Sequence, residues 1–346
     1  MQGPRILPGD DPAAIAEAAE RIRAGEPVAF PTETVYGLGA DALDPVAVAR
    51  VFEIKARPRF DPLIVHLADP AELARHVLAS DAADPRVERL VERYWPGPLT
   101  LVLRKRDTIP GIVTAGLDTV AVRMPDHPVA LALLRAAGVP VAAPSANPFG
   151  RLSPTRAEHV ARQLAGRVGL VLDGGPCRIG VESTVLQLAA GRARLLRPGG
   201  LSLEEIEAVI GPVEVPPEGE AVSLSPGRAG AHYAPRPTLV LAPPHEPVPA
   251  APGERLGLLA ADEAGRLAAE ASSGPFAAVE VLSPDGDPVA AAARLFEALH
   301  ALDEAGLDRI VAQPVPETGL GRAVMDRLRR AAASSADPAP VMVDAS

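Results

Sequence analysis

The sequence holds a single cysteine, Cys177, so it can form neither an internal disulfide nor a cysteine metal cluster. Aromatic residues make up only 3% of the chain, whereas hydrophobic residues make up 47%, which predicts an aliphatic core. No apolar run reaches the roughly 18 residues of a membrane helix, and no segment has the pattern of a signal peptide. We therefore expect a reduced, cytoplasmic protein with no membrane segment.

Several catalytic motifs are also missing. The chain has no zinc-protease His-Glu-x-x-His motif, no phosphate-binding loop ending in Gly-Lys-Ser/Thr, and no Gly-x-Ser-x-Gly elbow. Its seven histidines show no metal spacing. We identify no metal ligand set in the protein.

Charge is unevenly distributed along the 346 residues. Residues 1–202 contain 24 basic and 22 acidic side chains, whereas residues 203–346 contain 10 and 22. The first part can carry a local positive surface for an anionic ligand, and the second is an acidic, solvated part. A basic nucleic-acid-binding domain is not indicated.

The length favours two domains, and the apolar patterns agree. Residues 1–211 alternate helical patterns with short β-rich runs, which predicts an α/β domain with one long twisted mixed sheet. Residues 212–237 are rich in proline and glycine, which is typical of a linker. Residues 238–346 follow a β-β-α-β-α-β-α order, which predicts a small Rossmann-like three-layer domain without a glycine-rich nucleotide loop.

The stretch KARPRFDPLIVH, residues 55–66, places three cations in five positions. Pro58 and Pro62 stiffen it, and arginine forks with a lysine charge are suited to phosphate oxygens. The alternative is a solvated helix end, where cations are also favoured. We favour a phosphate site in which Arg57 is exposed in a cavity.

The stretch TVAVRMPDHP, residues 119–128, puts Arg123 near the end of an apolar strand. A buried arginine is costly unless it is paired, so Arg123 meets a carboxylate of the protein or of a ligand. The sequence alone leaves both open.

Two further stretches carry hydroxyl groups. PTETVYGLGAD, residues 31–41, has two threonines and a tyrosine beside a glycine-rich turn and can bind a polar ligand, although an ordinary strand-to-helix turn is the favoured interpretation of this stretch taken alone. APSANPFGRLSPT, residues 143–155, contains Ser145 and the only asparagine of the chain, Asn147. Ser153 before Pro154 also fits a helix cap.

These stretches closely resemble motifs of the YrdC-like family, and so do YWPGPLTLVL, GVESTVLQL and LLRPG. Together they occur in the order that this family shows. SPGRAGAHYAP and GLGRAVMDRLRRAA resemble its longer, two-domain branch, the L-threonylcarbamoyladenylate synthases. The resemblance covers nearly the whole chain. It implies the YrdC-like fold, in which the twisted sheet and helices form a concave cavity.

The resemblance also implies the reaction of L-threonine, bicarbonate and ATP to L-threonylcarbamoyladenylate, pyrophosphate and water, with Mg²⁺ accompanying ATP. The product serves the threonylcarbamoylation of tRNAs that read ANN codons. The implied L-threonine contacts are Thr34, His66, Arg123, the backbone of Ala143, and Ser183. The implied ATP contacts are Arg57, Asp61, Thr119, Ser145, Ser153, Arg197 and Tyr233. Lys55 and Arg57 are the implied catalytic residues, and residues 212–237 are expected to act as a lid.

Two alternatives remain at this stage. Related folds occur in double-stranded RNA-binding or ribosome-maturation proteins and in carbamoyl transfer for hydrogenase maturation. The acidic second half argues against the first, and the second would need acylphosphatase and zinc-finger segments, which the chain lacks. A hand-off of product to the tRNA threonylcarbamoyl transferase is a possible partnership, and direct tRNA binding stays open.

Overall fold

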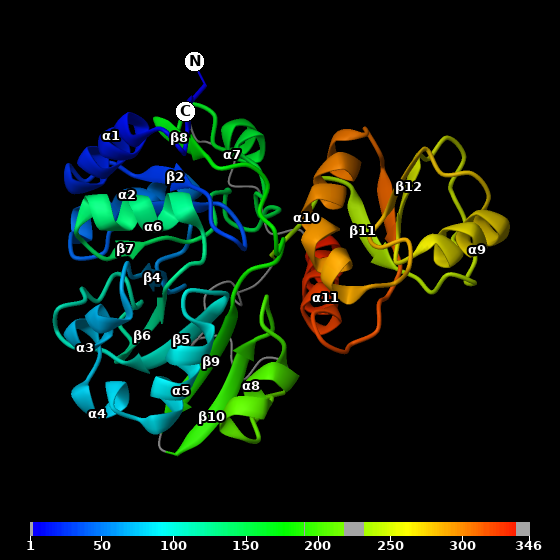
Figure 1. Cartoon of the computed structure of the whole chain (residues 1–346). Helices are drawn as coiled ribbons and strands as arrows, with labels where there is room; N and C mark the ends of the chain where they lie inside the picture. The colour runs from blue at the N-terminus through cyan, green and yellow to red at the C-terminus, as the bar shows by residue number, and fades with distance from the viewer. Residues whose placement is uncertain (1–2, 190, 218–231, 337–346) are drawn as a thin grey trace. The chain divides into compact units, whose positions relative to one another are not determined.

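A computed structural model of the chain describes residues 3–189, 191–217 and 232–336 (Figure 1). The chain divides into two compact units, residues 1–149 with 153–229 and residues 150–152 with 230–346. In the second unit, the carbonyl of Gly150 accepts the N–H of Ala234 at 2.8 Å, and Arg151 lies 3.6 Å from the carboxylate of Asp303. The chain therefore crosses between the units three times.

Many helices begin with an aspartate followed by a proline. The carboxylates of Asp11, Asp44 and Asp84 accept the backbone N–H two residues further on, at 2.9, 2.8 and 2.8 Å. The following proline lacks an N–H group, and its fixed φ suits the first helical position. The helical segments of the first unit are α1 Pro12–Arg23, α2 Pro45–Lys55, the 3₁₀ turn Pro70–Glu72, α3 Leu73–His76, α4 Ala79–Ala82, α5 Pro85–Tyr94, α6 Pro128–Ala137, α7 Ala157–Gln163 and α8 Leu203–Ile210.

The first unit is built on one ten-stranded mixed sheet in the order β1-β8-β2-β3-β7-β4-β6-β5-β9-β10. This confirms the predicted long mixed sheet. Helices α1 and α6 pack together over strands β2, β7 and β8, and α5 and α8 cover the β5-β9-β10 end. The strands are β1 Arg5–Pro8, β2 Val28–Phe30, β3 Gly37–Asp41, β4 Ile64–His66, β5 Leu99–Arg104, β6 Thr119–Arg123, β7 Val141–Ala142, β8 Leu170–Asp173, β9 Thr184–Ala189 and β10 Arg192–Arg197.

The interpretation of residues 37–41 as a glycine-rich turn was wrong. They form β3, which lies antiparallel to both β2 and β7 inside the sheet. A Cβ atom at Gly39 would lie 2.6 Å from the Phe30 ring and 2.7 Å from the Val141 side chain. Glycine is needed here because large side chains of the two neighbouring strands occupy the space of its missing one.

The expected linker is shorter than its composition suggests. Val213 is buried in the core of the first unit, and Glu214 pairs with β10 through the bonds Glu214 N–H to Ala193 O and Leu195 N–H to Glu214 O, at 2.9 and 2.8 Å. At the other end, His232 belongs to the second unit, where its N–H donates to Ser334 at 2.8 Å. Residues 218–231, the middle of the expected lid, lie outside the described residues.

The second unit is a four-stranded parallel sheet in the order β11-β14-β12-β13. Helix α9 packs on one face, and α10 and α11 lie together on the other (Figure 1). The predicted three-layer order is thereby confirmed. The elements are β11 Thr238–Leu241, β12 Leu256–Ala260, α9 Glu263–Ser273, β13 Ala278–Val281, α10 Pro288–Glu304, β14 Arg309–Ala312 and α11 Gly321–Ala336. None of the helices in the described ranges is long and apolar enough to cross a membrane.

A buried glutamine links the carboxyl ends of β12 and β14. Parallel sheets of this kind bind ligands where neighbouring strands lead to helices on opposite faces. Here Gln313 accepts the N–H of Ala261 at 3.0 Å and donates to the carbonyl of Gly265 at 2.8 Å. A Cβ atom at Gly265 would lie 2.3 Å from the Gln313 amide oxygen, so the side chain itself fills this place.

His66 ends β4 in the middle of the large sheet, opposite Arg123 on one side and Val141 on the other. Its ring meets the edge of Phe30 with centroids 6.2 Å apart. The pKa of His66 is lowered to about 3. Burial of the ring is the main cause, and the positive charge of Arg123 is the second. The imidazole is therefore neutral in the folded chain at physiological pH.

This burial predicts a pH-dependent stability. The unfolded His66 takes up a proton near pH 6.5 and the folded one near pH 3, so stability falls as the pH drops through that window. The slope reaches at most about 1.4 kcal/mol per pH unit. Urea unfolding at pH 7 and pH 5 should show a smaller loss for His66→Gln than for the wild type. His245→Gln, at an exposed histidine, is the control and should lose as much as the wild type. Equal losses for all three proteins would contradict the prediction.

Candidate active site

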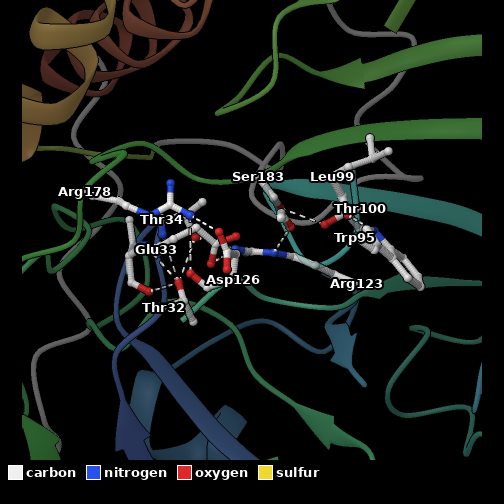
Figure 2. Close-up of polar contacts among 12 residues, drawn as sticks. Thr32, Glu33, Thr34, Trp95, Leu99, Thr100, Arg123, Asp126, Arg178 and Ser183 are labelled. Atoms are coloured by element: carbon white, nitrogen blue, oxygen red, sulfur yellow. Dashed lines mark hydrogen bonds and ion pairs between the residues drawn. The ribbon is translucent and has the colours of Figure 1, made fainter. Parts of the chain in front are cut away.

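Arg123, at the carboxyl end of β6, is clamped by two loops (Figure 2). Its Nη2 lies 2.6 Å from Oε2 of Glu33, its Nη1 donates to the hydroxyl of Thr34 at 3.0 Å, and its Nε donates to the carbonyl of Gly97 at 3.2 Å. Arg123 is 3% exposed and Glu33 is fully buried. Of the two partners that the sequence allowed for Arg123, the structure shows a carboxylate of the protein.

The loop after β2 is held by a chain of hydroxyl groups. Thr34 accepts from Arg123, and its hydroxyl lies 2.9 Å from that of Thr32, which donates to the carbonyl of Val35 at 2.6 Å. The N–H groups of Thr34 and Val35 both approach the Thr32 oxygen at 3.2 Å. The hydroxyl of Thr34 therefore has a fixed direction at the guanidinium.

Ser183 precedes β9 and has its own polar partners. Its hydroxyl lies 2.8 Å from that of Thr100, and Nη2 of Arg197 donates to its carbonyl at 2.9 Å (Figure 2 shows the Thr100–Ser183 pair). Gly199 packs against this backbone, because a Cβ there would lie 2.3 Å from the carbonyl of Glu182. Arg197, predicted for ATP, is thus bonded to a residue predicted for threonine.

The strand registers place several of these residues at one edge of the sheet. β4 and β6 are parallel, so His66 and Arg123 stand side by side at their carboxyl ends. The amino ends of β5 and β9 lie at the same edge and bring Thr100 and Ser183 there. The N–H of Ala143 donates to the carbonyl of Ile64 at 3.0 Å, so this donor belongs to the sheet.

Lys55, the last residue of α2, is buried and holds a loop. Its Nζ donates to the carbonyl of Ser145 at 2.5 Å and to that of Asn147. The pKa of Lys55 is held well below its usual value, mainly by burial and secondly by the positive charge of Arg57. These contacts fix the loop that carries the Ser145 and Asn147 side chains. The described contacts of Nζ are therefore with the backbone of this loop.

Arg57 is not exposed in a cavity, so that expectation was wrong. It forms an ion pair with Asp61 at 2.8 Å and donates to the carbonyl of Pro62 at 2.9 Å, and both charged side chains are buried. Of the three clustered cations, only Arg59 is exposed. The two prolines bring the chain back on itself, so that the carboxylate of Asp61 reaches the guanidinium.

Two other residues predicted for ATP, Thr119 and Ser145, lie near the amino ends of β4 and β6. Thr119 begins β6, and Ser145 forms a bridge with Gly37 next to β7. Ser153 does not cap α7, because the N-cap residue of this helix is Arg156. The hydroxyl of Ser153 instead donates to Oε1 of Glu182 at 2.5 Å. Glu182 directly precedes Ser183, so Ser153 is tied to the residues at the carboxyl ends of β4 and β6.

Tyr233 lies in the second unit. Its ring is 1% exposed, packs 5.5 Å from the Phe296 ring and has the guanidinium of Arg327 at 5.2 Å. Its φ is +62°, a left-handed conformation that a tyrosine rarely adopts. The contact of Tyr233 with ATP stays a prediction.

Sequence analysis missed three partners of the predicted residues: Glu33, Thr100 and Glu182. Both glutamates lie inside the quoted motifs, each next to a residue that was singled out. An acidic residue within an otherwise apolar or hydroxyl-rich motif was the available signal. In residues 3–189, 191–217 and 232–336, no three His, Cys, Asp or Glu side chains lie so that they could hold a metal ion.

Comparison with known proteins covers both units. Residues 20–199 match the family described as "Telomere recombination", and residues 201–333 match the family described as "Threonylcarbamoyl-AMP synthase, C-terminal domain". The threonylcarbamoyl-AMP synthase of Pyrococcus abyssi is 49% identical over 320 residues, which cover 91% of this chain and 92% of that protein. That of Bacillus subtilis is 46% identical over 335 residues, 92% of each chain.

A solved structure is similar over nearly the same length. The crystal structure of Pyrococcus abyssi Sua5 complexed with L-threonine matches with a TM-score of 0.82 and 42% identity, covering 93% of this chain and 95% of that one. Sequence and fold thus agree across both units. The chain belongs to the threonylcarbamoyl-AMP synthase family.

Proposed function

We propose that this chain is an adenylate-forming nucleotidyltransferase that condenses L-threonine, bicarbonate and ATP into threonylcarbamoyl-AMP, pyrophosphate and water. The observation that carries the proposal is the clamped Arg123–Thr34 contact, in a chain that matches a threonine-bound relative over nine-tenths of its length. The product would serve the modification of tRNAs that read ANN codons.

Arg123 would recognise the carboxylate of threonine. A guanidinium has five N–H donors, and the three described contacts engage each of its nitrogens once. Donors therefore remain for a substrate carboxylate, which an arginine can pair in bidentate fashion. Thr34, His66, Ser183 and the backbone at Ala143 would contact the rest of the amino acid.

The chemistry needs no covalent nucleophile from the protein. The threonine amine would attack the carbon of bicarbonate, forming a carbamate and water, and a carbamate oxygen would then attack the α-phosphorus while pyrophosphate leaves. Catalysis would rest on positioning and on charge stabilisation. Magnesium bound with ATP would offset charge on the leaving pyrophosphate, held mainly by the phosphate oxygens themselves.

The ATP half would be built on the loop that Lys55 holds. We assign the nucleotide to Arg57, Asp61, Thr119, Ser145, Ser153 and Arg197, with Tyr233 and the lid as further proposed contributors. Because Nζ of Lys55 bonds two backbone carbonyls, its effect on ATP would be exerted through the position of Ser145. We further propose that the adenylate is transferred to the tRNA threonylcarbamoyl transferase. We also propose a cytoplasmic location for this reaction.

Incubation with ATP, threonine and labelled bicarbonate tests the function directly. Pyrophosphate release that depends on threonine, together with a labelled adenylate, is the expected result. Binding of double-stranded RNA without any adenylate would instead favour the RNA-binding alternative. In that case the affinity should fall steeply with salt concentration.

Arg123→Lys should raise the KM for threonine more than the KM for ATP. Lysine keeps the positive charge, but it lacks the fork that meets Glu33, Thr34 and a carboxylate together. We expect a rise of roughly tenfold or more for threonine, since a charge-assisted bond contributes about 1.5–3 kcal/mol. Steady-state kinetics with each substrate varied in turn measure this. A larger effect on ATP would show that the half-sites are assigned the wrong way round.

Lys55→Met should lower stability as well as activity. Methionine has a similar length but no donor, so the buried carbonyls of Ser145 and Asn147 lose a partner, at a cost of about 1–3 kcal/mol each. The free energy of unfolding should fall and the KM for ATP should rise, because the loop is no longer held. Lys105→Met, at the only other lysine, controls for the loss of charge. Unchanged stability with lost activity would instead indicate a direct phosphate contact.

A further inference from the structure

Glu33 is a charged residue in the site to which no role has been assigned. Its side chain is fully buried, and its Oε2 lies 2.6 Å from Nη2 of Arg123. Its own carbonyl accepts the N–H of Ile179 at 2.8 Å, so the backbone around it is fixed as well. Within the described part of the chain, Arg123 is the ion-pair partner of this carboxylate.

The contacts of Arg123 determine the plane of its guanidinium. Consecutive residues, Glu33 and Thr34, hold the two terminal nitrogens, and the carbonyl of Gly97 holds Nε from another loop. An arginine at a strand end would otherwise extend its head towards water. Fixing its rotatable bonds costs entropy, and here the cost is met in folding, before any substrate arrives.

We propose that Glu33 is a positioning residue, which sets the orientation of the Arg123 guanidinium for the carboxylate of the amino-acid substrate. The proposal rests on the proposed function, since it specifies how that site recognises threonine. Glu33 acts through Arg123 and does not touch the substrate. What matters is the place of its oxygen atom more than its charge, because a negative charge beside Arg123 by itself repels a substrate carboxylate.

Two conservative variants separate orientation from charge. Glu33→Gln keeps the side-chain length and an acceptor oxygen but removes the charge. Glu33→Asp keeps the charge but is one methylene shorter, so its carboxylate cannot reach the same place. If Glu33 acts by orienting Arg123, Glu33→Asp should bind threonine more weakly than Glu33→Gln. If Glu33 acts through its charge, Glu33→Gln should be the weaker binder.

Calorimetric titration of the full-length chain with L-threonine and with threoninamide, which lacks the carboxylate, provides the measurement. Glu33→Asp should weaken threonine binding about tenfold and threoninamide binding less than threefold, since the lost interaction is a charge-assisted bond to the carboxylate. Glu33→Gln should change either Kd less than threefold. Glu17→Asp is the matched control. Glu17 lies on α1, and its carboxylate pairs with Arg5 at 2.7 Å, so shortening it should change neither the Kd for threonine nor that for threoninamide.

Several results would overturn the proposal. An unchanged threonine-to-threoninamide ratio in Glu33→Asp would do so, as would a glutamine variant that binds threonine worse than the aspartate variant. If neither variant stays folded, the pair is a folding element and the proposal is wrong. A wild-type chain that binds no threonine would refute the proposed function itself, a result distinct from the others.

Discussion

A positive charge that leaves water must be met by oxygen atoms, and the first unit buries several such charges. An unpaired buried cation costs several kcal/mol, so each one dictates the place of its partners. Arg123 holds Glu33 and Thr34, and Lys55 holds the carbonyls of Ser145 and Asn147. Strand pairing brings these loops to the ends of β4 and β6, but the charges fix their final positions. Moving any of these loops would leave a buried charge without its partners.

The sequence predicted most elements because their signals are local. Apolar helical patterns mark helices, and short β-rich runs mark strands, as at α2 and β5. Strand β3 was missed because the signal at residues 37–41 is glycine, and the reason for glycine lies in the neighbouring strands. That reason is tertiary, and no local pattern carries it.

The sequence singled out candidate site residues, but it did not predict the contacts that they make. The pairing of Arg57 with Asp61 was concealed by a pattern that fits an exposed cation cluster equally well. The partner of Arg123 shows the same limit. Asp126 lies only three positions away in sequence, yet it pairs with Arg178, whereas Glu33 comes from a distant loop. Which acid meets which base depends on how strands are ordered in the sheet.

The second unit shows why the likeness of its fold to nucleotide-binding sheets carries no function by itself. Parallel sheets of this kind bind ligands beyond the carboxyl ends of their strands, but here Gln313 bonds to Ala261 and Gly265 at that place. The side chain takes the hydrogen bonds that a ligand would otherwise offer there.

The excursion of Gly150–Leu152 into the second unit bears on how such a chain is inherited. A gene that ended before residue 230 would leave the carbonyl of Gly150 without the N–H of Ala234, and Arg151 without Asp303. Three residues that the second unit uses are therefore encoded within the first. In an exchange of second units between relatives, the pairing of Arg151 with Asp303 would depend on both parents, whereas the backbone bond of Gly150 would not.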